Sequence, residues 1–567
     1  MNHEERTPLI AKQGSISILV NQCLCSRSIN RMSTYGSQAL TPESSIFLDS
    51  LNPGEIFLPK EKKNSQIEDS GKTNAEDDRI DAGYKAKASI LNAAIQEIGM
   101  GKYQWHLFTV VGFGWASDNL WPIVTSLILA PIAKEFNVSH SPLLTLAQSI
   151  GLLGGALLWG FGCDLFGRKL SFNFTIGSTA IFALVAAFSP NFPFLCVFAC
   201  LWSTGVGGGL PVDSTLFLEF LPGSHQYLLT ILSIFWSIAQ LVVTLVAWPL
   251  LSNFSCNSNA TSCSKTENFG WRWILIIFGS ISVLMFGLRF FIFRIFESPK
   301  YLMGKGMDAE AVATIHKVAR YNGVRSTLKL EHLEEISHVK CPEVSSSAVN
   351  MKSSFARSME KLSSQHIRAL FATPKLAFST SLIIVIWAFI GLGFPLYNSF
   401  IPFIQNQRGI DFGDSSISMT YRNTLIIAAI SLPGALIGAL FVQLPQIGRK
   451  GSLAISTFLT GASLLASTTA KNSNTLLGWN CAFGLASNFM YAVLYSYTPE
   501  IFCTKDRGTG NAITASANRI FGIMAPIVAM TADLKTPVPV YLSGALFFGA
   551  GLLTLLLPFE SRGKASL

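Results

Sequence analysis

Twelve apolar runs, each close to the length of a membrane span, constrain the fold of this 567-residue chain most strongly. Six runs precede a polar stretch, and six more follow it. About 20 apolar residues are needed to cross the hydrocarbon of a bilayer as a helix. The pattern therefore predicts an all-α membrane protein with twelve transmembrane helices in two six-helix halves. The runs lie near residues 106–130, 143–162, 170–189, 194–218, 228–251, 272–296, 376–403, 422–443, 451–469, 474–497, 510–531 and 538–558.

Composition supports a bilayer as the main surroundings of the chain. Hydrophobic residues make up 50% of it, charged residues only 13%, and the mean hydropathy is +0.41. A soluble domain carries about 25% charged residues. The formal net charge of +9 does not indicate a nucleic-acid partner, because the basic residues cluster in short loops and tails, as orientation signals do.

The runs divide the chain into two halves, a loop and two tails. The first 104 residues are polar and lack the pattern of a cleaved signal peptide, so we expect a largely disordered tail. Part of the central loop, residues 307–340, is charged and is expected to be partly helical. The predicted segments are the cytoplasmic tail 1–104, the first half 105–296, the cytoplasmic central loop 297–375, the second half 376–558 and the cytoplasmic tail 559–567.

Loop charges predict the orientation in the membrane. With the first tail inside, the inner loops hold most of the cations, which follows the positive-inside rule. Glycosylation sequons at Asn137, Asn253 and Asn259 all fall in the expected outer loops. Cys256 and Cys263 share the long outer loop, where they form either a disulfide or two free thiols.

A short basic turn occurs twice between apolar runs. Residues 160–169 read Gly-Phe-Gly-Cys-Asp-Leu-Phe-Gly-Arg-Lys, and residues 447–450 repeat its end as Ile-Gly-Arg-Lys. The repetition indicates a duplicated membrane protein. Parallel repeats of this kind build one major class of secondary transporters, with the substrate site at the midplane between the repeats.

The pattern Gly160-x3-Asp164-x2-Gly167-Arg168-Lys169 resembles the loop between spans two and three of the major facilitator superfamily. Four other segments resemble the sugar-porter-related branch, and two resemble the synaptic-vesicle-protein-related and organic-ion transporters, with fungal relatives the most similar. The resemblance covers roughly residues 105–565 and implies a carrier that works by alternating access. The six segments are residues 270–273, 297–302, 497–500, 558–563, 101–105 and 219–222.

The repeated turn also predicts charge contacts at the inner ends of the spans. Asp164 lies near a helix N-terminus, where the helix dipole favours a carboxylate, and Arg168 can pair with Glu219. In the second half, Arg449 and Arg507 can pair with Glu500. The resemblance implies that such pairs hold the halves together in the outward-facing state and break in the inward-facing one. Alternatively, Arg168 and Lys169 serve only as topology anchors.

Two positions depart from the family's pattern. The second turn carries Pro445 where the family has an Asp, so the second charge cluster is incomplete. Leu201 occupies the position of an Arg in span four that the resemblance links to proton coupling. This second departure leaves the coupling of the carrier open.

Ionisable residues inside spans are functional candidates, because a charge in hydrocarbon requires a partner or water. Asp118, in Trp115-Ala116-Ser117-Asp118-Asn119, either binds a cation, cycles a proton or is a fixed structural acid. Arg519 either holds a substrate carboxylate or phosphate, pairs with Asp118 or is structural. Asp213 is either a gating or coupling acid or part of the inner charge cluster, and Arg289 is expected to snorkel toward the inner surface.

Polar and aromatic residues at helical spacing supply further candidates for a solute site. Aromatic faces with a few amides suit a small organic solute, although packing is the alternative for each residue. Besides Trp115 and Asn119, the candidates are Trp236, Gln240, Tyr397, Asn398, Asn488 and Tyr491.

The first tail contains an acidic dileucine pattern, Glu5-Arg6-Thr7-Pro8-Leu9-Ile10. It resembles the sorting signals that adaptors read to direct membrane proteins to the vacuole or lysosome. We therefore expect a vacuolar or lysosomal membrane, with the plasma membrane as the alternative. Glu5, Leu9 and Ile10 carry this signal.

The sequence predicts a monomeric secondary transporter of a small organic solute or ion, with proton coupling through Asp118 as the first hypothesis. A facilitative uniporter of a sugar-like solute and a non-transporting solute sensor or trafficking protein are the alternatives. An enzyme is not expected, because the residues offer no nucleophile with a base and an orienting group. No metal site and no cofactor are expected.

Overall fold

The computed structural model describes residues 86–558 except 226–227, 257–262, 294, 341–366, 369, 413–415, 445, 503–506 and 533–535. Every regular element in this part of the chain is a helix. The sorting signal Glu5 to Ile10, the sequon at Asn259 and Pro445 lie outside the described residues, as do the side chains of Asp164 and Arg507.

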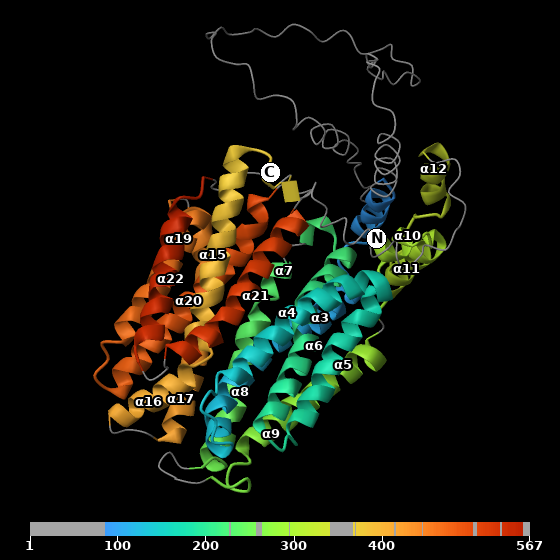
Figure 1. Cartoon of the computed structure of the whole chain (residues 1–567). Coiled ribbons are helices and arrows are strands. Elements are labelled where there is room, and N and C mark those ends of the chain that lie inside the picture. The colour runs from blue at the N-terminus through green and yellow to red at the C-terminus, as the bar shows by residue number, and fades with distance from the viewer. Residues whose placement is uncertain are drawn as a thin grey trace, which may run out of the picture. The chain divides into compact units, whose positions relative to one another are not determined.

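The first half contains six spans, drawn from blue to green in Figure 1. Span five is divided into α7 and α8 by a turn at 232–233, and span six ends in the π-helical turn η2. The elements are α3 (Lys102–Glu135), α4 (Leu143–Phe166), α5 (Arg168–Ala186), α6 (Phe192–Phe220), η1 (Gly223–His225), α7 (Leu228–Ile231), α8 (Ile234–Asn253), α9 (Gly270–Gly287) and η2 (Leu288–Ile292).

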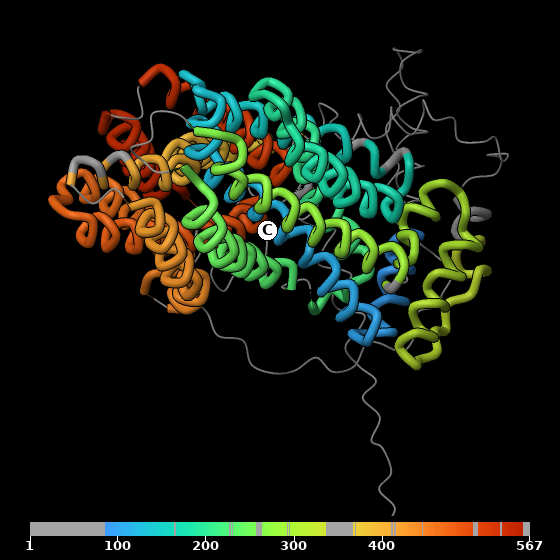
Figure 2. The backbone as a smooth tube through the Cα atoms, turned by 90° about the horizontal axis from the view of Figure 1, so that it is seen from below, coloured from blue at the N-terminus to red at the C-terminus, as the bar shows by residue number. Residues whose placement is uncertain are grey.

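The second half repeats this layout, and Figure 2 shows its yellow-to-red helices beside those of the first half. Pro433 divides span eight, because proline cannot donate the backbone hydrogen bond that continues a helix. The elements are α15 (Pro374–Asn398), α16 (Ile401–Asp411), α17 (Ile417–Ser431), α18 (Gly434–Gln443), α19 (Gly448–Ser467), α20 (Ser473–Ile501), α21 (Arg507–Thr531) and α22 (Val538–Leu555).

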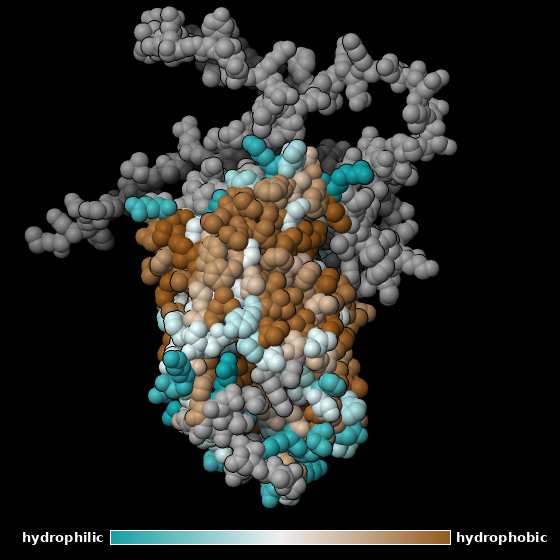
Figure 3. Space-filling view, turned by 60° about the vertical axis from the view of Figure 1, so that its left-hand side comes forward, coloured by the Kyte–Doolittle hydropathy of each residue, from teal (hydrophilic) through white to brown (hydrophobic). Residues whose placement is uncertain are grey.

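The surface of the helices matches a membrane environment. Nine spans among the described residues are long and apolar enough to cross a bilayer, and the long helices α3, α19 and α20 bring the spans to twelve. Figure 3 shows hydrophobic side chains gathered in a band, with hydrophilic side chains beyond it. The predicted twelve-helix fold is confirmed. We call the end that carries residues 86–98 and 558 the inner end, following the orientation predicted from the loops.

One part of the predicted tail is ordered, which corrects the expectation of disorder up to residue 104. Residues 86–98 form a helix that buries Leu91, Ile95 and Ile98. These side chains join a core with helices of the central loop, which lie beside them in Figure 1. Apolar residues three or four apart share one helix face, but the sequence does not show which partner covers it. The loop helices are α10 (Pro299–Gly304), α11 (Asp308–Asn322) and α12 (Glu331–Lys340).

The Gly101 to Trp105 segment attaches these loop helices to the first span. The Tyr103 backbone N–H donates to Asn322 Oδ1 at 2.9 Å, and Asn322 Nδ2 donates to Gln104 Oε1 at 2.8 Å. The Tyr103 ring also stacks on Phe296, with 5.2 Å between ring centroids. These contacts join α11 to the inner end of α3.

A buried ion pair joins α3 to α9 at the outer end. Arg272 donates twice to the Glu135 carboxylate, at 2.9 and 2.6 Å, and Trp271 Nε1 donates to the same group at 2.8 Å. Asn268 Nδ2 adds a contact of 3.0 Å. The Gly-Trp-Arg-Trp segment therefore supplies donors to one buried carboxylate. In the loop that precedes it, Cys256 and Cys263 form a disulfide.

Replacing Glu135 by Ala removes the acceptor and leaves the Arg272 guanidinium buried without its counter-charge. Removing one member of a buried ion pair costs about 3–5 kcal/mol. We expect a clear fall in the thermal unfolding midpoint of the purified protein in detergent. Glu267→Ala, at an exposed position of the same outer segment, should leave the midpoint nearly unchanged. Equal midpoints for the two variants would contradict this role of Glu135.

Candidate functional site between the two halves

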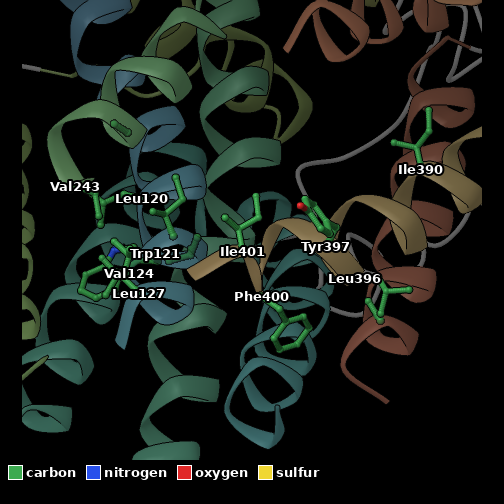
Figure 4. Packing of buried hydrophobic residues seen from close by; sticks show 14 of the residues in the cluster. Leu120, Trp121, Val124, Leu127, Val243, Ile390, Leu396, Tyr397, Phe400 and Ile401 are labelled. Carbon is green, nitrogen blue, oxygen red and sulfur yellow. The ribbon is translucent and has the colours of Figure 1, made fainter. Parts of the chain in front are cut away.

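The outer ends of the two halves are closed against each other. Tyr421 Oη of α17 donates to the Leu127 carbonyl of α3 at 3.1 Å, and Trp248 Nε1 of α8 donates to Ser418 Oγ at 3.2 Å. Residues of both halves also share one hydrophobic core, in which Ile401 lies near Leu120 and Tyr397 (Figure 4). The path from the outer side is therefore shut in this structure.

A small cavity lies between the halves, on the inner side of these contacts. Its volume is about 40 Å³, and Gln240, Asn398 and Asn488 line it together with Phe394 and Ser126. Ligand pockets commonly measure about 300–1,000 Å³, whereas one water needs only about 10–15 Å³. The cavity in this state is large enough for water molecules but too small for an organic solute, so solute binding requires the halves to move apart.

Aromatic rings cross from one half to the other next to the cavity. The ring centroids of Trp115 and Trp236 are 5.0 Å apart, as are those of Trp236 and Tyr495 and those of Tyr495 and Trp387. Tyr491 lies 6.2 Å from Tyr495. We call these five residues the aromatic cluster. Because Gln240 follows Trp236 by one helical turn, the cluster borders the cavity on its inner side.

The Asp118 carboxylate and the Arg519 guanidinium meet beside the aromatic cluster. Arg519 Nη2 of α21 lies 3.5 Å from Asp118 Oδ1 of α3, and the two side chains are 18% and 19% exposed. Arg519 Nη1 also donates to the Leu152 carbonyl at 3.5 Å. Asn119 Nδ2 donates to the Trp236 carbonyl at 2.9 Å. Of the three options that the sequence left for Arg519, the structure therefore shows pairing with Asp118.

A second ion pair lies wholly inside the first half. Arg289 Nη2 donates to Asp213 Oδ2 at 2.9 Å, and both side chains are fully buried. Arg289 also donates to the carbonyls of Val110 and Phe172 at 3.0 and 2.9 Å. The expectation that Arg289 snorkels is wrong. The π-helical turn η2 contains Arg289, and such turns change the direction of a side chain relative to an α-helix.

Charge contacts gather at the inner ends of the spans. Arg168 pairs with Glu219, and Arg449 pairs with Glu500. Each pair joins helices of one half, so any part in holding the halves together stays a proposal. The Glu297 carboxylate accepts from the backbone N–H groups of Arg168 and Lys169 at 3.0 and 3.2 Å. It therefore occupies the dipole-favoured position at the start of α5.

Burial, and then the nearby Arg168 charge, lower the pKa of Lys300 on α10. The positive charges at this inner end are therefore close enough to influence one another. The Glu297 carboxylate lies among them, because it accepts hydrogen bonds at the start of α5 and at the start of α10.

The structure places the remaining residues predicted from the sequence in different parts of the protein. Tyr397 donates to Asn480 Oδ1 at 2.6 Å within the second half and does not line the cavity. Trp387, Tyr495 and Phe394 were not among the candidates, because nothing in an apolar run distinguishes an interfacial aromatic from a lipid-facing one. Asn137 and Asn253 are exposed at the outer end.

Comparisons with known proteins agree with this architecture. Residues 107–447 match the family described as Major Facilitator Superfamily. The chain belongs to that superfamily. It is 52% identical to MFS siderochrome iron transporter 1 of Ceriporiopsis subvermispora, over 86% of this chain and 93% of that protein. It is 28% identical to organic cation/carnitine transporter 7 of Arabidopsis thaliana, over 84% and 95% of the two chains.

The fold matches solved structures of the same superfamily. A partially occluded inward open conformation of the Escherichia coli xylose transporter XylE aligns with a TM-score of 0.61 at 18% identity, over 82% of this chain and 99% of that chain. Together with the sequence relatives, this confirms the predicted family. The protein is a multi-pass membrane protein and a secondary transporter of a small solute, not an enzyme.

Gly114 of α3 makes room for the buried Asp213–Arg289 pair, because a Cβ at this position would collide with the Asp213 carboxylate. We expect Gly114→Ala to displace the pair and to destabilise the protein by about 1–3 kcal/mol, as overpacking does. Thermal unfolding in detergent measures the effect. Gly154→Ala is the matched control, since open space surrounds that helical glycine. Similar midpoints for the two variants would contradict the close packing at Gly114.

Proposed function

We propose that this transporter couples the movement of a small organic solute to a proton, with Asp118 as the proton-binding group. The solute binds between the halves, beside Asp118, Arg519 and the aromatic cluster. The observation that supports this proposal most directly is the contact of 3.5 Å between Asp118 and Arg519. Among the described ion pairs it alone joins the first half to the second.

We further propose that the structure represents an inward-facing state. The outer contacts Tyr421–Leu127 and Trp248–Ser418 are made, while the Asp118–Arg519 pair keeps partial exposure. The outward-facing state then requires those outer contacts to break. Because protonation removes the charge of Asp118, it weakens the central pair and changes how strongly the halves attract each other at the midplane. This links proton binding to the rocking of the halves.

The proposal includes contributions from other predicted residues. Gln240, Asn398 and Asn488 orient the solute in the enlarged cavity, and the inner pairs act as latches between states. The N-terminal signal is proposed to recruit a sorting adaptor that directs a monomeric, glycosylated transporter to the vacuolar membrane. A relative named as a siderochrome iron transporter makes ferric siderophores useful members of a solute panel.

Uptake by proteoliposomes over a panel of solutes, with and without a pH gradient, tests the proposed coupling. The wild-type protein should accumulate its solute only with the gradient. Asp118→Asn should lose gradient-driven accumulation, because an amide neither binds nor releases the proton. Glu310→Gln, at an exposed position of α11, should behave as wild type. Uptake that ignores the gradient would indicate a uniporter, and binding without uptake would indicate a sensor.

The two inner pairs should contribute unequally. The Arg168 and Glu219 side chains are 11% and 10% exposed, whereas those of Arg449 and Glu500 are 26% and 25% exposed. Solvent screens an exposed pair more strongly, so its contribution is smaller. We expect Arg168→Ala to reduce the initial uptake rate more than Arg449→Ala. Equal reductions in proteoliposomes would exclude this asymmetry.

A further inference from the structure

We infer that the solute is an organic monoanion with an aromatic or apolar body, and that it moves together with one proton. This rests on the proposed role of Asp118 and adds the chemical class of the solute. The inference comes from the charges of the central pair, from the unused donors of Arg519 and from the rings beside them.

The donors of Arg519 make longer contacts than those of the buried arginines Arg272 and Arg289. Both of its described contacts measure 3.5 Å, the outer limit for a hydrogen bond. By contrast, Arg272 contacts Glu135 at 2.6 and 2.9 Å, and Arg289 contacts its three oxygen partners at 2.9–3.0 Å. A guanidinium has five N–H donors and binds carboxylates or related oxyanions in a forked geometry. Arg519 therefore retains the capacity to bind a second anion.

The empty site is electrically balanced. When Asp118 is ionised, its negative charge and the positive charge of Arg519 cancel, so the pair presents no net charge to the surrounding spans. If Asp118 binds a proton, the Arg519 charge loses its partner, and an uncompensated charge among spans is costly. A solute anion at Arg519 restores the balance. The site loaded with both a proton and an anion is therefore neutral again.

The partly loaded states explain why the two ligands would move together. A proton alone leaves Arg519 uncompensated, and an anion alone leaves two negative charges beside one positive charge. Closing the halves removes water from the site, which raises the penalty of an unpaired charge. Only the empty and the fully loaded sites are balanced, so these two states should change sides most readily. The aromatic cluster beside the pair supplies contact area for the body of the solute.

Other solute classes give different charge balances at this site. A neutral solute with a proton leaves Arg519 unpaired and moves one net charge. A cation that competes with the proton for Asp118 would be exchanged against it, in the opposite direction. A zwitterion would pair with both residues and would need no proton. The response to a pH gradient and to a membrane potential therefore distinguishes the four classes.

The test uses proteoliposomes and a panel of aromatic sulfonates and carboxylates, each with an uncharged amide or sulfonamide and a quaternary ammonium counterpart. Sulfonates remain charged and cross lipid slowly, so their uptake reports the protein. We expect an outside-acid pH gradient to drive accumulation of anions, while a potassium–valinomycin potential has no effect. Accumulation of an uncharged or quaternary ammonium counterpart in place of the anions would overturn the anion assignment. Accumulation driven by the membrane potential would do the same. Neither result would contradict transport itself. If the gradient drives no member of this panel but drives another solute of the wider panel, the anion assignment fails and proton coupling stands; if it drives no solute of either panel, both proposals fail.

Variants of Asp118 and Arg519 test the role of each charge separately. Arg519→Gln should weaken anion uptake about 10- to 100-fold, which corresponds to the loss of one charged hydrogen bond, and Arg519→Lys should restore part of it. Asp118→Asn should keep exchange of labelled for unlabelled anion but lose gradient-driven accumulation. The double variant Asp118→Asn/Arg519→Gln keeps a neutral site and should fold, as gel filtration can verify, yet fail to bind anions. Arg320→Gln, at an exposed position of α11, is the matched control. Wild-type anion uptake by Arg519→Gln overturns the inference.

Discussion

A charged side chain among membrane spans needs a counter-charge, and this requirement organises the interior of the protein. Three pairs meet it at three depths. Glu135–Arg272 lies at the outer end, Asp118–Arg519 at the middle of the spans, and Asp213–Arg289 toward the inner end of the first half. The helices that carry these residues are held in register by the pairs, because moving any of them would expose a charge to a medium that cannot solvate it.

The three pairs differ in burial and in contact distance, and the difference matches their positions within or between the halves. Glu135–Arg272 and Asp213–Arg289 join helices of one half, are nearly or fully buried, and have contacts of 2.6–2.9 Å. They suit a rigid body. Asp118–Arg519 joins the two halves, keeps partial exposure and has a longer contact of 3.5 Å. A carrier whose halves rock against each other needs this combination, because the pair between the halves must form and break while these two pairs inside the first half stay intact.

Much of the fold follows from local sequence properties. The apolar runs predicted all twelve spans, since a backbone in hydrocarbon must satisfy its own hydrogen bonds and the helix does so within one segment. The buried position of the Arg289 side chain did not follow from local sequence properties. Its place near a span end favours snorkelling, and only the turn of η2 and the facing carboxylate on α6 bring it inward. Residues 86–98 were likewise assigned to a tail, because the core that they join includes side chains of α10 and α11, more than 200 positions later.

The sequence by itself determined the number of spans, the duplication and the ionisable residues placed within apolar runs, because each of these depends on composition over one local window. Tertiary structure alone decided that Arg519 faces Asp118. It also decided that Trp387 and Tyr495 extend the aromatic contacts of Trp236 with Trp115. In the same way, it decided that Tyr421 closes the outer end against Leu127. These contacts depend on how each helix is rotated about its axis and on which distant helix packs against it. Packing of the whole bundle sets both, and no local pattern records them.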